Sequence, residues 1–265
     1  MRAEPRASVI PTYHEITEDN SGYSYSVTAE QFAAHMVVIA RHRPAAGSRP
    51  QITFDDGVQS QYRHGLPAMR QNSVTATFFV NAGLIGVVPE YMDWTQLAET
   101  LRQGHRIQSH GWSHAYLPDC SDAQLEDELR RSKGTLEEKL GSVVDEISMP
   151  GGRWDRRVLE ACARAGYRRV YLSDPWARSK AHTGVEVVGR LMVRSTMGSV
   201  ELEKELNASG ARVLAARARY RVKEGIKGAL GHRLYHRLWL ALSGYNQFAE
   251  DNQRTPELDF RQRPK

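Results

Sequence analysis

The chain has 265 residues, of which 40% are hydrophobic and 25% are charged. This composition excludes a disordered chain, a collagen and a disulfide-stapled mini-protein. The two cysteines, Cys120 and Cys162, form no CxxC pair, which argues against a cysteine-based zinc site. The first residues lack the apolar core of a secretory signal peptide, and no apolar run is long enough to span a bilayer. We therefore expect a cytoplasmic protein.

Strands and helices are predicted to alternate along most of the chain. Short apolar or β-branched runs that end at turn residues predict strands over 8–13, 51–54, 74–80, 107–109, 146–149, 167–172 and 185–193. Helical periodicity predicts helices over 28–43, 94–102, 121–140 and 156–165. Thr28 and Ser121 are the expected N-caps, with Gln31 and Gln124 at the capping-box positions. This alternation is typical of parallel βα units.

Two carboxylates, Asp55 and Asp56, directly follow the strand predicted over 51–54. Neighbouring side chains of a strand point to opposite faces, but a turn at Gly57 would bring both carboxylates into one pocket. Two carboxylates in one pocket repel each other, so the pair would need a cation or a shared proton. The same residues are also typical of a simple strand-to-turn cap.

Two imidazoles, His110 and His114, lie four residues apart just after another predicted strand. Such pairs are common on protein surfaces, but imidazole together with carboxylate also suits zinc or another divalent first-row metal. Active sites of parallel α/β folds lie at the carboxyl ends of the strands, where Asp56 could meet both histidines. A metal held there would lower the pKa of its bound water to about 7, and Asp55 could accept a proton from that water.

Two motifs, Thr53-Phe54-Asp55-Asp56-Gly57 and Ser109-His110-Gly111-Trp112-Ser113-His114, together resemble those of a known enzyme family. This family is carbohydrate esterase family four, the polysaccharide deacetylases, whose members carry the NodB-homology domain. The resemblance extends from about Val9 to Met197 and implies a distorted (β/α) barrel, an α/β fold.

The resemblance implies a role for each matching residue. Asp55 would be the general base, and Asp56, His110 and His114 would be the ligands of a divalent metal, with zinc favoured. Residues expected to line the substrate pocket are Trp112, Pro150, Asp174 and Trp176.

The chain departs from the family pattern at two catalytic positions. Ser148 stands where the family has an Arg that steadies the base, and Arg153 and Arg190 are candidate replacements. Arg194 stands near the place of the family's general-acid His. An Arg does not give up its proton at ordinary pH, but Arg194 could stabilise an oxyanion. His14 follows the first predicted strand and could approach the pocket rim, although we expect a structural role for it.

The C-terminal part of the chain carries most of the positive charge. Residues 207–242 have a net charge of +7, within a total of +5 for the chain, and apolar residues recur there every four positions from Val222 to Leu242. This pattern predicts a basic amphipathic helix that packs on the barrel or contacts anionic lipid peripherally. No nucleic-acid binding is expected, because aromatic residues are not interleaved through the patch.

These observations predict a barrel over 1–200, a basic helical extension over 201–248 and a polar tail over 249–265. The expected function is metal-dependent removal of N-acetyl groups from an N-acetylated sugar in a poly- or oligosaccharide, such as an exopolysaccharide, or in a lipid-linked glycan. One alternative is a catalytically degenerate barrel that only binds a glycan. Another is a metal-dependent amidase that acts on a non-sugar amide.

Overall fold

The computed structural model describes residues 9–19, 21–42, 51–175, 178–179, 184–208, 218 and 222. The chain divides into two compact units, Met1–Arg217 and Ala218–Lys265, and every helix and strand named below belongs to the first. Helix α6 (Ser199–Leu206) spans the domain boundary predicted at residue 200. Nearly all of the predicted basic extension beyond α6, and the whole of the predicted tail, lie outside the described residues. None of the helices in the described ranges has the length and apolarity needed to cross a membrane.

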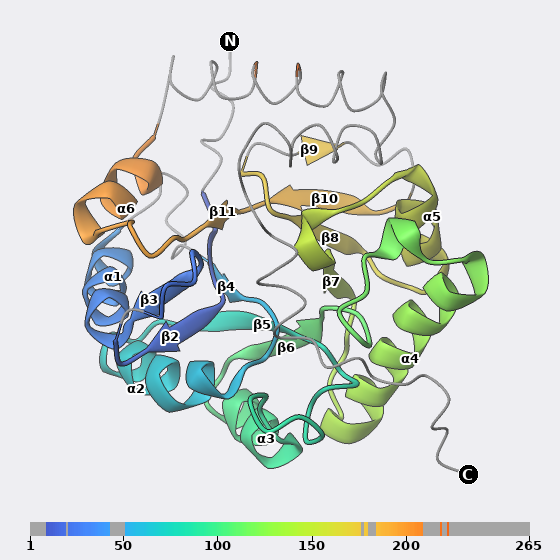
Figure 1. Cartoon of the computed structure of the whole chain (residues 1–265), viewed down its shortest axis with the longest axis horizontal. Coiled ribbons are helices and arrows are strands. Elements are labelled where there is room, and N and C mark those ends of the chain that lie inside the picture. Colours follow the sequence, from blue (N-terminus) through green and yellow to red (C-terminus); the bar gives the residue numbers. More distant parts are fainter. Residues whose placement is uncertain are drawn as a thin grey trace. The chain divides into compact units, whose positions relative to one another are not determined.

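One nine-stranded sheet forms the centre of the first unit (Figure 1). Its strands are β1 (Pro11–Tyr13), β4 (Ile52–Phe54), β5 (Ala76–Val80), β6 (Arg106–Ser109), β7 (Glu146–Ser148), β8 (Arg169–Leu172), β9 (Arg178–Ser179), β10 (Glu186–Gly189) and β11 (Leu191–Met192). Their spatial order is β11-β1-β4-β5-β6-β7-β8-β10-β9. All neighbouring strands pair in parallel except β9, which pairs antiparallel with β10. The predicted α/β barrel is confirmed.

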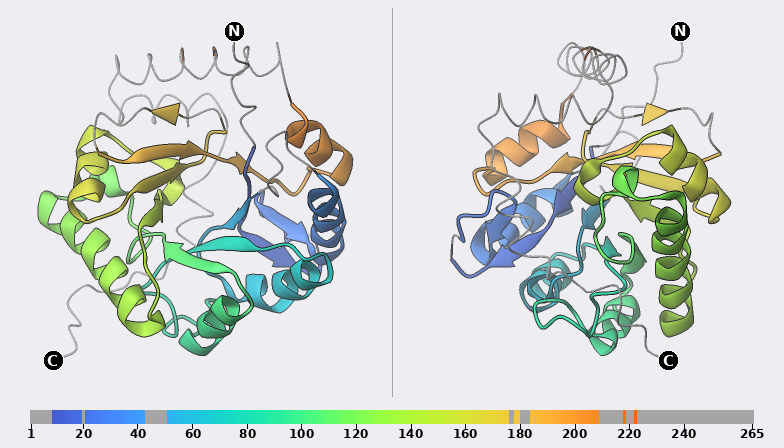
Figure 2. Two further views of the ribbon diagram at one scale, coloured as in Figure 1. Left: turned by 180° about the vertical axis from the view of Figure 1, so that it is seen from behind. Right: turned by 45° about the vertical axis from the view of Figure 1, so that its right-hand side comes forward.

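The sheet closes at Arg190, the single residue between β10 and β11. Strand β10 pairs with β8, whereas β11 pairs with β1 on the other side of the gap. The Arg190 N–H donates to the Leu172 carbonyl at 3.1 Å, and the next N–H, of Leu191, donates to the Ile10 carbonyl at 2.8 Å. The strand predicted over 185–193 is therefore one segment that changes neighbours halfway and closes the barrel (Figure 2).

Helices cover the outside of this ring of strands (Figure 1). They are α1 (Ala29–Arg41), α2 (Leu66–Gln71), α3 (Trp94–Arg102), α4 (Asp122–Leu140) and α5 (Arg156–Arg164), together with α6, which packs against α1. A π-helical turn (Gln61–Gly65) leads into α2, and 3-10 turns occupy Leu117–Asp119 and Pro150–Gly152. A separate pair of short parallel strands, β2 (Glu15–Thr17) and β3 (Ser26–Thr28), lies between β1 and α1 in the chain.

The predicted N-caps are confirmed, but only one of the two capping boxes forms. Ser121 and Gln124 make the full reciprocal pair at the start of α4. At α1, Thr28 accepts the Gln31 N–H at 3.1 Å, but the Gln31 side chain turns away. It donates to the carbonyls of Ser195 and Met197 at 3.1 and 2.6 Å, so a tertiary contact replaces the local one.

The side chains of β1 and β4 alternate between two environments. Tyr13 and Phe54 point outward and contact Phe32 of α1 at ring-centroid distances of 4.9 and 5.7 Å. Thr12 and Thr53 alternate with them, and their hydroxyls are hydrogen-bonded to each other at 2.8 Å. By this period of two, the residue after Phe54 points into the barrel interior.

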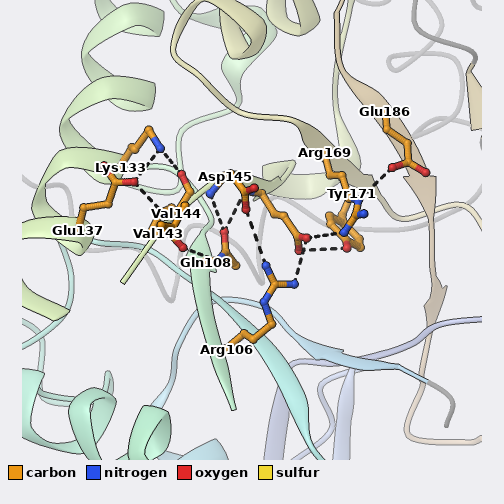
Figure 3. Close-up of polar contacts among 11 residues, drawn as sticks. Arg106, Gln108, Lys133, Glu137, Val143, Val144, Asp145, Arg169, Tyr171 and Glu186 are labelled. Carbon is orange, nitrogen blue, oxygen red and sulfur yellow. Dashed lines mark hydrogen bonds and ion pairs between the residues drawn. The ribbon is translucent and has the colours of Figure 1, made fainter. Parts of the chain in front are cut away.

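A network of charged side chains ties together the amino ends of β6, β7, β8 and β10 (Figure 3). The Glu146 carboxylate is 2% exposed and accepts hydrogen bonds from Arg106 at 3.0 Å, Arg169 at 2.8 Å and the Tyr171 hydroxyl at 3.1 Å. Arg169 also pairs with Glu186 at 2.9 Å. Because active sites of parallel folds lie at the carboxyl ends of the strands, this network serves the stability of the barrel.

Candidate metal-binding active site

Three predicted ligands converge at the carboxyl ends of β4 and β6. The Asp56 Oδ1 atom lies 3.4 Å from His110 Nε2 and 3.5 Å from His114 Nε2. Within the described ranges, this is the one group of three or more His, Cys, Asp or Glu side chains close enough to hold an ion. Metal–ligand bonds of about 2.0–2.1 Å in a tetrahedron place ligand atoms roughly 3.3–3.4 Å apart. The three atoms therefore fit a metal such as zinc.

The hydrogen bonding of His110 prepares it for such a role. Its Nδ1 lies 2.9 Å from the Ser148 carbonyl, which can only accept, so Nδ1 carries the hydrogen and the Nε2 lone pair faces Asp56. Burial alone would lower the pKa of His110, but the carboxylates of Asp55 and Asp56 raise it above its usual value. The same cluster lowers the pKa of Asp56, since its imidazole neighbours outweigh the effect of burial.

Left-handed backbone conformations orient two of the predicted ligands. Asp56 has φ 77° and His114 has φ 65°, values that non-glycine residues rarely adopt and that often mark functional sites. The Asn81 N–H donates to the Asp56 carbonyl at 3.2 Å and helps to hold this turn. Gly57 follows with φ 83°, and a Cβ there would lie 2.8 Å from the Val80 side chain. The turn predicted at Gly57 thus requires glycine.

Asp55 forms a buried ion pair with Arg190. Two guanidinium nitrogens of Arg190 donate to the two carboxylate oxygens of Asp55, each at 2.7 Å. The side chains are 0% and 3% exposed. The Ser148 hydroxyl donates to Asp55 Oδ2 at 3.0 Å and accepts from Arg190 at 2.7 Å. Burial would raise the pKa of Asp55, but the Arg190 guanidinium and its hydrogen bonds outweigh burial and lower it.

Of the two candidate replacements for the absent Arg, Arg190 is the one that contacts Asp55, the predicted base. It reaches Asp55 from the closure point of the barrel, whereas Ser148 occupies the end of β7 and joins the same hydrogen-bond network. Arg153 instead pairs with Asp119 at 2.6 Å and lies over the Tyr116 ring at 4.6 Å.

His14 lies beside this pair, and its role, expected to be structural, stays a prediction. Strand β1 pairs in register with β4 up to Tyr13 and Phe54, so the next residues along are His14 and Asp55. The Gln61 side chain donates to the backbone carbonyls of both, at 2.6 and 2.5 Å. The Nδ1 atom of His14 is buried and has no hydrogen-bond partner among the described residues. Burial lowers its pKa, against the opposing effect of the carboxylates of Asp56 and Asp55.

The remaining predicted residues are less central. The Trp112 ring lies under the Arg131 guanidinium at 3.9 Å and is in close contact with Gly83. Pro150 is buried near Gly111, which follows His110, and Asp174 is half-buried after β8. Their contacts with substrate stay predictions.

The last two predicted residues are Arg194 and Trp176. Arg194 is exposed just after β11, and its role in stabilising an oxyanion stays a prediction. Trp176 lies outside the described residues.

Comparison with known proteins points to one family. The sequence profile of the family described as polysaccharide deacetylase matches residues 44–170. The peptidoglycan-N-acetylglucosamine deacetylase of Bacillus cereus is 30% identical over 173 residues, which is 63% of this chain and 78% of that protein. The chitooligosaccharide deacetylase of Bradyrhizobium is 28% identical over 154 residues, covering 56% of this chain and 68% of that protein.

Among solved structures, the Streptococcus pyogenes deacetylase PplD in complex with acetate superposes with a TM-score of 0.69 at 21% identity. The match covers 77% of this chain and 100% of that one, so the two proteins share a fold.

Proposed function

Because this chain belongs to the polysaccharide deacetylase family, we propose that it is a metal-dependent hydrolase that removes N-acetyl groups from amino sugars of a glycan. The observation that carries the proposal is the convergence of Asp56, His110 and His114 next to the buried carboxylate of Asp55. The predicted family resemblance and the carbohydrate deacetylase class are confirmed by the comparisons. The metal and the glycan belong to the proposal.

Asp55 is the proposed general base. A divalent ion such as zinc, when bound, lowers the pKa of its water and polarises the acetyl carbonyl. Asp55 accepts a proton from the attacking water, and Arg190 keeps this carboxylate ionised and in one orientation. Ser148 completes the support by donating to the oxygen Oδ2.

His14 is the proposed proton donor to the leaving amine. It lies one register step from the strand pair that positions Asp55, and its buried Nδ1 has no partner among the described side chains. Burial lowers its pKa, but the nearby carboxylates of Asp56 and Asp55 favour the protonated form that a donor needs. This arrangement would supply an acid in a chain that has Arg194 near the place of the family's general-acid His.

The leaving group tests this assignment. An amide needs a protonated nitrogen to leave, whereas the nitrophenolate of p-nitrophenyl acetate leaves without a proton. We expect His14→Gln to lower de-N-acetylation by about 10²–10⁴-fold and to change ester hydrolysis far less. An equal loss on both substrates would contradict a proton-donor role for His14.

Chitooligosaccharides are the first substrates to test, because one relative is named a chitooligosaccharide deacetylase and another a peptidoglycan-N-acetylglucosamine deacetylase. Acetate release should stop on dialysis against a strong chelator, return with zinc, and be lost in Asp55→Asn. Release that survives both the chelator and Asp55→Asn would remove the proposal. Zinc and glycan binding without acetate release would favour the degenerate glycan-binding barrel, and release from non-sugar amides alone would favour the amidase.

A further inference from the structure

We propose that Glu128 of α4 is a positioning residue that holds the histidine loop (His110–His114) in its metal-binding shape. The inference rests on the proposed function, since it concerns the same metal site. Neither motif of the family resemblance contains Glu128, and no charge pattern in the sequence singles it out.

Glu128 occupies an unusual place on its helix. The buried face of α4 carries Leu125, Leu129 and Leu136, and Glu128 lies on the same face with 5% exposure. A carboxylate on a buried helix face costs free energy unless hydrogen bonds replace its lost water. Three donors do so here, and all three belong to the histidine loop.

These three hydrogen bonds fix the middle of the loop. The backbone N–H groups of Trp112 and Ser113 donate to Glu128 Oε2 at 2.8 and 3.0 Å. The Ser113 hydroxyl donates to Oε1 at 2.5 Å. A Cβ on Gly111 would lie only 3.2 Å from Oε2, so the loop is packed closely against the carboxylate.

The opposite side of the loop is held by backbone alone. The N–H groups of Ala82 and Gly83 donate to the carbonyls of Gly111 and Trp112 at 3.1 and 2.8 Å. Glu128 thus accepts from the amides of Trp112 and Ser113, while the segment after β5 donates to the carbonyls of Gly111 and Trp112. Between them they orient the peptide units that set His110 and His114 against Asp56, including the left-handed conformation of His114.

Zinc affinity of the full chain, measured by competition with a chromogenic chelator, tests the proposal. Supporting partners of metal ligands typically contribute 10–100-fold in affinity, so we expect Glu128→Ala to bind zinc at least about 10-fold more weakly. Glu128→Gln should stay within about 3-fold of wild type, because its carbonyl can accept both N–H groups and its amide can donate to Ser113 Oγ. Cobalt absorption spectra should show altered ligand geometry in Glu128→Ala alone.

Leu136→Ala is the matched control, because it removes packing from the same helix face two turns away from the loop. We expect it to lower the unfolding temperature and leave zinc affinity unchanged. Equal zinc affinity in wild type and Glu128→Ala, or an equal loss in Leu136→Ala, would overturn the inference. If Glu128→Ala does not fold, Ser113→Ala decides: weaker zinc binding supports the role and unchanged binding overturns it. A wild-type chain that binds no zinc would also remove the proposed function.

Discussion

Replacing Arg190 by Met tests the buried ion pair on which the proposed base depends. The change keeps most of the side-chain volume but leaves the Asp55 carboxylate, 3% exposed, without its counter-charge. Removing one partner of a buried pair costs about 3–5 kcal/mol. In a domain of this size, that loss lowers the unfolding temperature by roughly 6–20 °C. Burial then raises the pKa of Asp55, because the guanidinium that lowered it is gone.

Two measurements check this prediction. Thermal unfolding gives the stability, and the dependence of kcat/KM on pH should show its acid limb shifted to higher pH, since Asp55 must be ionised to accept a proton. Arg194→Met is the stability control, because Arg194 is exposed four residues further on and its replacement should cost within about 0.5 kcal/mol. An Arg190→Met protein with the unfolding temperature and acid limb of wild type would refute the role given to the pair.

Three further predictions concern the barrel. Glu146→Ala removes the acceptor at the centre of the charged network in Figure 3. Calorimetry should show that the free energy of unfolding falls by about 1–3 kcal/mol, and an unchanged value would mean that the network does not stabilise the fold. His35 and His105 are buried with pKa values of about 4, below the unfolded value of about 6.5, so both are neutral in the folded protein at neutral pH. The contribution of these neutral histidines to stability is therefore complete above pH 6.5. The unfolding temperature of the metal-free protein should decrease as the pH is lowered from 6.5 to 4, and an unfolding temperature that stays constant over this range would contradict the prediction. Gly57→Ala should cost more than about 1 kcal/mol and weaken zinc binding, because its Cβ would lie 2.8 Å from a neighbouring side chain. Gly104→Ala, with a similar φ but open space, separates strain from the clash, and equal losses would rule the clash out.

Elements with strong local signals could be predicted almost to the residue. Helix α3 runs over Trp94–Arg102, as predicted, because Asp93 caps it and its apolar face is periodic. Helix α4 begins after Ser121 and ends at Gly141, whose left-handed conformation stops it. Such signals depend on neighbours within one or two turns and need no knowledge of the rest of the fold.

Elements without such signals were not predicted. Strands β2 and β3 have three residues each, too few to show an alternating pattern. The π-helical turn at Gln61–Gly65 and the Pro next to the start of α2 break the helical period there. Both regions matter to the site, because Gln61 bridges the backbones of His14 and Asp55.

The metal ligands could be predicted from the sequence, whereas the partner of Asp55 could not. Asp56, His110 and His114 could be proposed from residue type and position at strand ends. For the partner of Asp55, the sequence left two candidates, Arg153 and Arg190. The choice between them depends on where the sheet closes, which the sequence does not show. The family profile covers residues 44–170, so His14 and Arg190 both fall outside it.

The residue at which the barrel closes is also the partner of the proposed base. Arg190 lies between β10, which pairs with β8, and β11, which pairs with β1, and its side chain is fully buried. There it lies within 5.3 Å of the Phe79 ring and 5.8 Å of the Tyr171 ring, apolar surroundings in which an unpaired guanidinium would be costly. Asp55 supplies the compensating charge and is itself kept ionised in return. Because its supporting Arg lies at this junction, the chain couples the state of its proposed base to the integrity of the whole barrel.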